Sequence, residues 1–169
     1  PAEKRLRNLQ HIHESGHHLL ALINDLLDVA KVEAGKMEVD WQNFSICELC
    51  SSVALLVQDQ ANRKGQHVVV ACIDQSCQVW ADHRLTRQVL LNLLTNAVKF
   101  TPEGGTITID CAEVGDQEVR VSVADTGVGI PEDKQHVLFN EFAQVDGTRD
   151  SNLGGTGLGL TLCKRFVEL

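Results

Sequence analysis

The sequence lacks the features that would tie a chain to a membrane or to nucleic acid. None of its apolar runs approaches the roughly eighteen residues of a membrane span, and it has no charged-then-apolar leader, so we expect a cytoplasmic segment without direct membrane contact. It also has no concentrated basic patch, and its formal net charge of -8 disfavours nucleic acid as a partner. Internal repeats and low-complexity segments are absent. What remains is a globular chain of 169 residues, long enough for one or two domains.

Disulfide bonds are not expected either, although the sequence contains six cysteines. The cysteines lie mostly within apolar helix and strand patterns, in a chain too large to need covalent cross-links. We therefore expect them to be reduced and mainly buried. Cys47 and Cys50 form one Cys-x-x-Cys motif, but no second pair follows. A metal or redox role for this pair is accordingly disfavoured, though it stays open.

Residues 2–34 are predicted to form one long helix that ends at Gly35. One side of this helix is an apolar stripe of Ile12, Leu19, Leu20, Ile23, Leu26, Leu27 and Ala30. At 1.5 Å per residue, such a helix is about 45 to 50 Å long, which is more than a small domain can cover. Part of the stripe must therefore pack against another helix, either one outside this sequence or one from a second copy. We expect a homodimer through this helix.

The remaining sequence alternates strand and helix patterns. Strands are expected at residues 37–41, 67–73, 78–80, 106–114 and 118–124, the last two as an antiparallel hairpin. Ser45 is predicted to cap a helix that runs to about residue 62, Asp82 to cap the next helix, and Pro131 to begin a helical turn. A final helix reaches Leu169. This order predicts an α+β fold, a two-layer sandwich of a mixed sheet and helices that is preceded by one long helix.

The chain is organised around residues 84–102, which combine two helical faces. The apolar face carries Leu85, Val89, Leu90, Leu93, Leu94 and Ala97, and the polar face carries Gln88, Asn92, Asn96 and Lys99. Asparagine is unfavourable inside a helix, so two of them on one face suggest a use. An amide oxygen suits Mg2+ and a lysine suits phosphate. The face is interpreted as one wall of a nucleotide site, and a solvated polar face is the open alternative.

Two glycine-rich motifs could complete such a site. The motif Asp125-Thr-Gly-Val-Gly129 follows a strand; its glycines allow close approach of a ligand, and its carboxylate can accept a hydrogen bond from an amino group such as that of adenine. The motif at residues 154–160, Gly-Gly-Thr-Gly-Leu-Gly-Leu, enters the last helix, where backbone amides and the helix dipole favour phosphate. It is neither a P-loop nor a dinucleotide fingerprint. Each motif alone also fits an ordinary turn.

Taken in order, these motifs resemble those of a known family. The Asn-containing helix, Asp-x-Gly-x-Gly, Phe-x-x-Phe at residues 139–142 and the second glycine motif are similar to the catalytic, ATP-binding domain of sensor histidine kinases. That domain belongs to the GHKL superfamily, which includes gyrase, a heat-shock chaperone and a mismatch-repair ATPase. Residues 15–36 resemble the second helix of the dimerisation domain. The resemblance therefore implies residues 1–35 as part of that domain and residues 36–169 as a Bergerat-type ATP-binding domain.

The resemblance also implies a role for each site residue, with ATP and Mg2+ as the bound species. Asn96 would be the Mg2+ ligand, Asn92 and Lys99 would face the phosphates, and Phe100 would lie near the base. Asp125 would bind the adenine amino group. Further contacts would come from the glycine motifs: Gly127 and Gly129 shaping the pocket, and Gly155, Thr156, Gly157, Leu158 and Gly159 holding phosphates at the hinge of a mobile lid over residues 143–156.

A kinase of this type transfers the γ-phosphate to a histidine and then to the receiver domain of a response regulator. The family's acceptor is His-Glu followed by a Leu-Arg-Thr-Pro-like run, whereas here His13-Glu14 precedes Ser15-Gly16. The acceptor is therefore expected upstream of Pro1, and none of His11, His13, His17 and His18 is expected to serve. Leu169 precedes strands that the family usually has. We expect a fragment of a sensor, which can be membrane-bound, that is not competent for autophosphorylation alone.

Two alternatives remain. Hydrolysing ATPases of the superfamily activate water with a glutamate four residues before the metal asparagine, a position occupied here by Asn92. An amide cannot act as a general base, so hydrolysis is disfavoured. The second alternative is a dimerising scaffold with a degenerate nucleotide site and no kinase activity. The presence of Asn96, Asp125 and the loop glycines argues against it.

Overall fold

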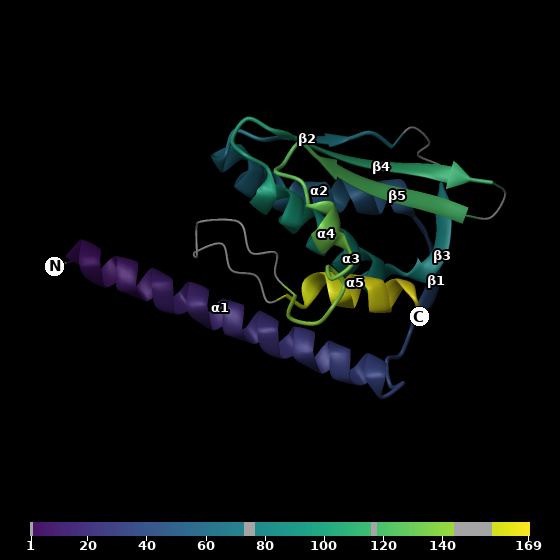
Figure 1. Ribbon diagram of the computed structural model, residues 1–169, viewed down its shortest axis with the longest axis horizontal. Coiled ribbons are helices and arrows are strands. Elements are labelled where there is room, and N and C mark those ends of the chain that lie inside the picture. Colours follow the sequence, from purple (N-terminus) through teal and green to yellow (C-terminus); the bar gives the residue numbers. More distant parts are fainter. Residues whose placement is uncertain (1, 73–76, 116–117, 144–156) are drawn as a thin grey trace.

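The computed structural model describes residues 2–72, 77–115, 118–143 and 157–169, and these form the expected long helix followed by an α+β sandwich (Figure 1). The elements in chain order are α1 (Ala2–Glu33), β1 (Trp41–Ser45), α2 (Ile46–Arg63), β2 (His67–Val70), β3 (Gln78–Asp82), α3 (His83–Phe100), β4 (Thr106–Val114), β5 (Glu118–Asp125), α4 (Glu132–Gln135) and α5 (Gly159–Val167). Among the described residues, no helix has both the length and the apolar character that crossing a membrane requires.

The main sheet is mixed, as the sequence predicted. Its three strands lie in the order β2-β4-β5, with β2 parallel and β5 antiparallel to β4. Side chains of β4 alternate between the two faces, and Ile107, Ile109 and Cys111 are buried. These side chains pack with the buried faces of α2 and α3, among them Val53 and Leu94. The apolar core therefore lies between one layer of strands and one layer of helices.

The strand predicted at residues 37–41 is wrong. Residues 36–40 have no regular structure, and β1 instead begins at Trp41 and ends at Ser45. Within the part of the chain that the structure describes, it pairs only with β3, antiparallel, with Trp41 opposite Asp82 and Ser45 opposite Gln78. Residues 37–41 do alternate between apolar and polar side chains. The pairing with β3, however, decides which residues form the strand. The strand predicted at residues 67–73 is also shorter in the structure, where β2 ends at Val70.

The helix caps were predicted correctly. The Ser45 side chain accepts a hydrogen bond from the Glu48 backbone N–H at 3.3 Å, and α2 follows. Asp82 caps α3 by accepting a hydrogen bond from the Leu85 N–H at 3.0 Å. Asp82 also accepts a hydrogen bond from the N–H of Asp40 at 3.0 Å, so one carboxylate fixes both the start of α3 and the approach to β1.

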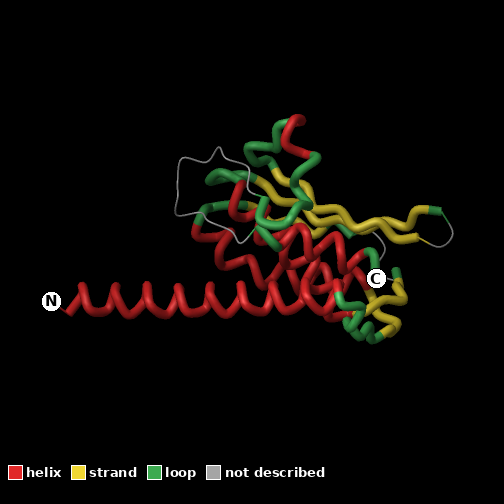
Figure 2. The backbone as a smooth tube through the Cα atoms, turned by 60° about the horizontal axis from the view of Figure 1, so that its bottom comes forward, coloured by secondary structure: helices red, strands yellow, loops and turns green. Residues whose placement is uncertain are grey.

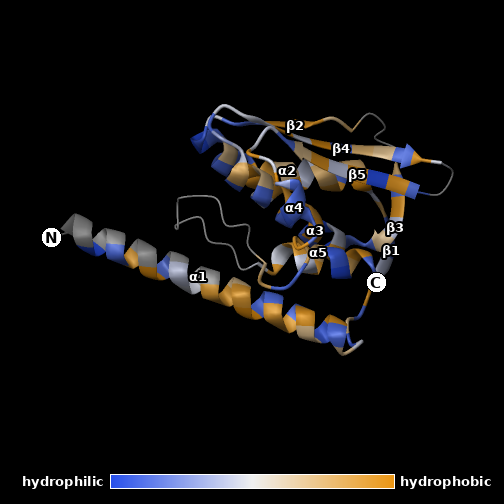
Figure 3. Ribbon diagram, in the orientation of Figure 1, coloured by the Kyte–Doolittle hydropathy of each residue, from blue (hydrophilic) through white to orange (hydrophobic). Residues whose placement is uncertain are grey.

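The long helix α1 extends beyond the sandwich, and its C-terminal part packs on α5 (Figures 1 and 2). There Val29 is buried against Leu162 and Phe166 of α5. Arg165 of α5 adds a salt bridge to Glu33 at 3.0 Å and another to Glu141 at 2.8 Å. Farther along α1 the apolar side chains are exposed (Figure 3), namely Leu9, Ile12, Leu19, Leu20, Ile23, Leu26 and Leu27. We call these seven residues the α1 stripe.

All six cysteines are free thiols, five of them buried and Cys72 half-buried, as the sequence predicted. Burial raises the pKa of the Cys50 thiol to about 12 and that of Cys163 to about 11. Burial therefore favours the protonated form of both thiols, which is less reactive than the thiolate.

Candidate nucleotide-binding site

Helix α3 is held at both ends, and this fixes the direction of its polar face. At the C-terminal end, the Lys64 ammonium donates hydrogen bonds to the carbonyl oxygens of Val98 at 2.7 Å and Lys99 at 3.1 Å. Gln66 donates from its side chain to Val98 and Thr101. These donors satisfy carbonyl groups that a helix end leaves without partners. Sequence reasoning missed Lys64 and Gln66, because their contacts cross from the end of α2 to the end of α3.

The polar face of α3 brings Asn92, Asn96 and Lys99 together at helical spacing, and all three are half-buried. Asn92 Nδ2 donates a hydrogen bond to the carbonyl oxygen of Gly159 at 3.3 Å. The Asn96 carboxamide has no hydrogen-bonding partner among the described residues. Its oxygen is therefore available to a ligand or metal ion.

Lys99 lies at the end of this face, next to the Phe100 ring. Its Nζ is 4.7 Å from the ring centroid, a cation–π distance. Burial lowers the pKa of Lys99, because desolvation disfavours the charged ammonium. An anionic ligand such as phosphate would offset that cost. Lys99 and Phe100 also line a cavity of about 260 Å³, together with Val128 from the first glycine motif.

Asp125 ends β5, where it lies beside the end of α3. Its Oδ1 accepts a hydrogen bond from the Gly127 N–H at 2.7 Å, which shapes the turn and leaves the carboxylate exposed. A Cβ on Gly127 would collide with that carboxylate and lie 2.8 Å from the Phe100 carbonyl oxygen. Gly129 has a φ of +68°, in the left-handed region that glycine favours. Both glycines are thus required by the backbone around Asp125.

The second glycine motif contacts the Phe-rich segment. Gly157 has a φ of +71°, and a Cβ there would lie 2.8 Å from the Phe142 backbone. The Phe142 N–H donates a hydrogen bond to the Gly157 carbonyl oxygen at 3.1 Å, and Phe142 itself has a φ of +58°. A non-glycine residue in this region is strained, which marks the junction as a constrained point. The sequence carried no signal for the strain at Phe142.

The start of α5 completes the assembly. Leu158 is buried at the N-cap position, and Gly159 is the first helical residue, facing Asn92. Gly155 and Thr156, and residues 144–156 of the predicted lid, lie outside the described residues. The structure thus brings α3 into contact with both glycine motifs, with Asn92 of its polar face meeting Gly159 and the backbone of Phe100 at its end meeting Gly127. A larger cavity of about 620 Å³ lies elsewhere, between α1 and α5, and is lined by none of the predicted site residues.

Comparison with known proteins identifies a family. The model for "Histidine kinase-, DNA gyrase B-, and HSP90-like ATPase" matches residues 81–169, from the end of β3 through α3 and both glycine motifs to the last residue. The match covers more than half of the chain, and it includes most of the sandwich and all of the predicted site residues.

Individual relatives extend the similarity to α1. The circadian input-output histidine kinase CikA of Synechococcus elongatus is 41% identical over 170 residues, covering 99% of this chain and 22% of that protein. A crystal structure of full-length ShkA in complex with AMPPNP has a TM-score of 0.84 and 34% identity, covering 98% of this chain and 34% of that one.

A second solved structure shows a kinase with a partner. The histidine kinase ThkA in complex with the response regulator protein TrrA has a TM-score of 0.66 and 26% identity, covering 82% of this chain and 40% of that chain. In each of these comparisons the chain spans less than half of the matched protein's length.

Proposed function

This chain belongs to the histidine kinase-, DNA gyrase B-, and HSP90-like ATPase family, and from that premise we propose that it is the ATP-binding catalytic core of a two-component sensor histidine kinase. Residues 36–169 form the catalytic domain in this proposal, and residues 1–35 contribute one helix of the dimerisation domain. The observation that carries it is that α3 contacts both glycine motifs, through the hydrogen bond between Asn92 and Gly159 and through the close approach of Gly127 to the Phe100 backbone. The similarity to ShkA, crystallised with AMPPNP, supports nucleotide as the ligand.

The residues present fit both the adenine base and the Mg2+-bound phosphates of a nucleotide. Asp125 accepts the adenine amino group, with Gly127 and Gly129 allowing the base to approach and Phe100 lying beside it. Lys99 and Asn92 face the phosphates, and Asn96 holds Mg2+ through its unpartnered amide oxygen. The backbone amides of the second motif, from Gly155 and Thr156 through Gly157, Leu158 and Gly159, bind phosphate oxygens at the start of α5.

Phosphoryl transfer requires mainly that the protein positions the reacting groups and neutralises the charge of the phosphates. Bound Mg2+ would supply neutralisation of phosphate charge. The chain's own part is to orient the nucleotide through Asp125, to add the positive charge of Lys99, and to surround the phosphates with backbone donors. No described residue at this site stands where a general base would act on water, because Asn92 occupies that position. Transfer to a protein side chain is therefore favoured over hydrolysis.

The acceptor in this proposal is a histidine of the dimerisation domain other than His11, His13, His17 and His18, and a response regulator receives the phosphoryl group next. The complex of ThkA with TrrA supports a partner of this class. The α1 stripe supports homodimerisation, because its seven apolar side chains are between 47% and 68% exposed in the single chain. Exposed apolar area of this extent along one helix favours a helical bundle.

The function is tested on the full-length protein with ATP labelled in its γ-phosphate. We expect acid-labile label on the protein, characteristic of phosphohistidine, and its transfer to a receiver domain. Asp125→Ala should lose nucleotide binding in calorimetric titration with a non-hydrolysable analogue, and Asn96→Ala should lose the Mg2+ dependence of that binding. Both variants need circular dichroism spectra that match the wild type.

Two outcomes would replace this proposal. Steady release of phosphate without labelled protein would establish a hydrolysing ATPase of the superfamily. Absence of nucleotide binding by folded wild-type protein would establish the dimerising scaffold.

A further inference from the structure

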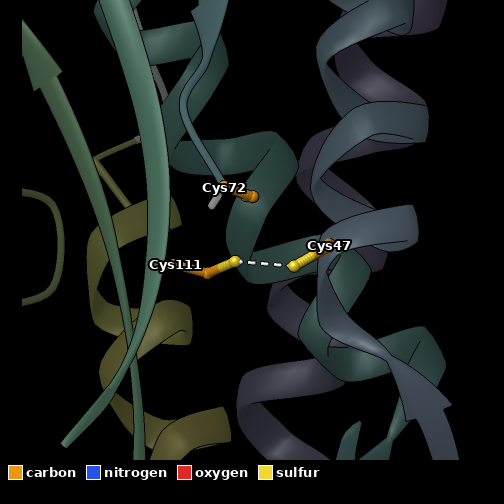
Figure 4. A group of neighbouring side chains, drawn as sticks. All are labelled: Cys47, Cys72 and Cys111. Atoms are coloured by element: carbon orange, nitrogen blue, oxygen red, sulfur yellow. Dashed lines mark hydrogen bonds between the residues drawn. The ribbon is translucent and has the colours of Figure 1, made fainter. Parts of the chain in front are cut away.

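Apart from the nucleotide site, three thiols meet in the core between α2 and the sheet. The Sγ atoms of Cys47 and Cys111 are 2.9 Å apart, and those of Cys47, Cys72 and Cys111 all lie within 4.8 Å of one another. We call these three residues the thiol cluster. Figure 4 shows Cys47 and Cys111 pointing toward each other from α2 and β4, with Cys72 beside them. Cys72 follows the end of β2, so three separate elements supply one sulfur each.

A fourth cysteine adjoins the cluster. Cys50 lies one helical turn after Cys47 on α2 and is fully buried, and the nearby Cys72 thiol contributes to raising its pKa. Four of the six cysteines of the chain are therefore gathered at one place. Only Cys47 and Cys50 are close in sequence; Cys111 comes from β4, and Cys72 comes from the segment that follows β2.

The distances in the thiol cluster are those of an incomplete thiolate site. A disulfide bond has an S–S length of about 2.05 Å. Sulfur atoms bound to one zinc ion at about 2.3 Å, in tetrahedral directions, lie roughly 3.8 Å apart. The separations in the cluster, from 2.9 Å to at most 4.8 Å, bracket the second value. Shifts of about 1 Å in side-chain position would place all three sulfurs around a single ion.

We propose that the thiol cluster is a binding site for a thiophilic d10 metal ion, with Zn2+ as the best-fitting ion. Cys47, Cys72 and Cys111 are the ligands. The site is enclosed by apolar core, so the charge of the filled site matters. The cysteine ligands bind as thiolates, so three protons pass to the solvent and three thiolates around Zn2+ carry one net negative charge. Half-buried Cys72 places that charge near the surface, where solvent offsets part of its cost.

A metal ion explains the arrangement better than a disulfide bond. A disulfide between Cys47 and Cys111 would use two of the sulfurs and leave Cys72 without a role. It would also need an oxidant to reach two buried sulfurs, whereas half-buried Cys72 gives a metal ion a first ligand near the surface. Once bound, the ion would connect the first turn of α2 to β4 and to the end of β2. Binding to the folded state alone would then stabilise the domain.

The test uses the reduced, metal-free protein with Co2+ as a spectroscopic probe for Zn2+. Thiolate ligands give Co2+ an intense charge-transfer absorption in the near ultraviolet, which histidine and carboxylate ligands do not give. We expect this absorption to appear on titration and to disappear when Zn2+ is added. A Zn2+ competition assay with a chelating dye then gives the affinity, a parallel titration with Cu+ shows which ion is preferred, and thermal unfolding should shift upward with Zn2+.

Cys72→Ser is the decisive variant, because Cys72 is half-buried and its replacement disturbs the core least. It should lower Zn2+ affinity at least about 10- to 100-fold, since loss of a ligand costs no less than loss of an outer-shell partner. The matched control is Cys163→Ala, a buried thiol in the other apolar cluster, which should bind as the wild type does.

Three results would overturn the proposal. The first is folded wild-type protein that shows no thiolate charge transfer with Co2+. The second is Cys72→Ser binding Zn2+ with unchanged affinity. The third is metal-free protein, isolated without reductant, whose mass shows that Cys47 and Cys111 have lost two hydrogens to a disulfide bond. Nucleotide binding is measured separately, so its failure would leave this test unaffected.

Discussion

Asn92 and Gly159 are joined by a hydrogen bond, from the side-chain Nδ2 of Asn92 to the backbone carbonyl oxygen of Gly159, at 3.3 Å and across 67 positions of sequence. The bond links the middle of α3 to the first residue of α5. It therefore sets where the end of the second glycine motif lies relative to α3. In the proposed site, Asn92 therefore both positions the second glycine motif and faces the phosphates.

Replacing Asn92 with alanine should weaken nucleotide binding more than it lowers stability. Loss of one partly buried hydrogen bond costs about 0.5 to 1.5 kcal/mol of unfolding free energy. Nucleotide affinity should fall further, because the loop loses its anchor and the phosphates lose an amide. Calorimetry with the ATP analogue and urea unfolding measure the two effects. An Asn92→Ala protein that is destabilised as expected, but binds the nucleotide with wild-type affinity, would refute the proposed role of Asn92 in the site.

Gly127→Ala should abolish nucleotide binding. Its Cβ would collide with the Asp125 carboxylate and lie 2.8 Å from the Phe100 carbonyl oxygen, so the turn that aims Asp125 must move. The matched control is Gly35→Ala, after the end of α1, at a φ of +62° with no atom near the added Cβ. That change costs about 1 to 2 kcal/mol of backbone strain away from the site and should leave affinity unchanged. Equal affinities in the two folded variants would contradict the geometry around Asp125.

Asp82 should make the stability of the fold depend on acidity. Burial alone would raise its pKa, but hydrogen bonds from the N–H groups of Asp40 and Leu85, together with nearby Arg84, outweigh burial and lower the pKa. A carboxyl whose pKa is lower in the folded state contributes stability above its unfolded pKa. This contribution disappears as the pH falls through the lower, folded value.

Asp82→Asn keeps a capping side chain and removes the charge, so its stability should vary less with pH in the acidic range. Urea unfolding of the variant and the wild type between neutral and strongly acidic pH measures this. The two curves should converge at low pH, where wild-type Asp82 is also protonated. A constant difference between them at all pH values would show that the charge of Asp82 is irrelevant.

Ile23→Glu should disrupt self-association. Ile23 lies within the α1 stripe and is 47% exposed in the single chain, so a dimer formed through α1 would bury it. A glutamate buried there would be desolvated without a partner. Sedimentation velocity should show monomer where the wild type shows dimer. The control is Leu55→Glu, the same kind of change at a 73% exposed position on α2, which should remain dimeric. Wild-type protein that sediments as a monomer at every concentration would refute the dimer.

Local patterns in the sequence predicted much of this protein. The 3.6-residue period of Leu85, Leu90 and Leu94 reports which face of a helix is buried, because helical geometry places such residues side by side. The caps at Ser45 and Asp82 were readable for the same reason, since a cap joins residues three positions apart. The order of the nucleotide motifs was sufficient to indicate the family, which the match over residues 81–169 confirms.

Tertiary structure alone decided which distant residues meet. The pairing of β1 with β3, the contact of Phe142 with Gly157, and the gathering of Cys72 and Cys111 beside Cys47 join residues that are far apart in sequence, and no local pattern shows that they meet. Each depends on how the helix layer is placed on the sheet, and that placement is a property of the whole core. Local propensity acts over a few residues, whereas contacts between elements are selected by burial summed over the entire domain.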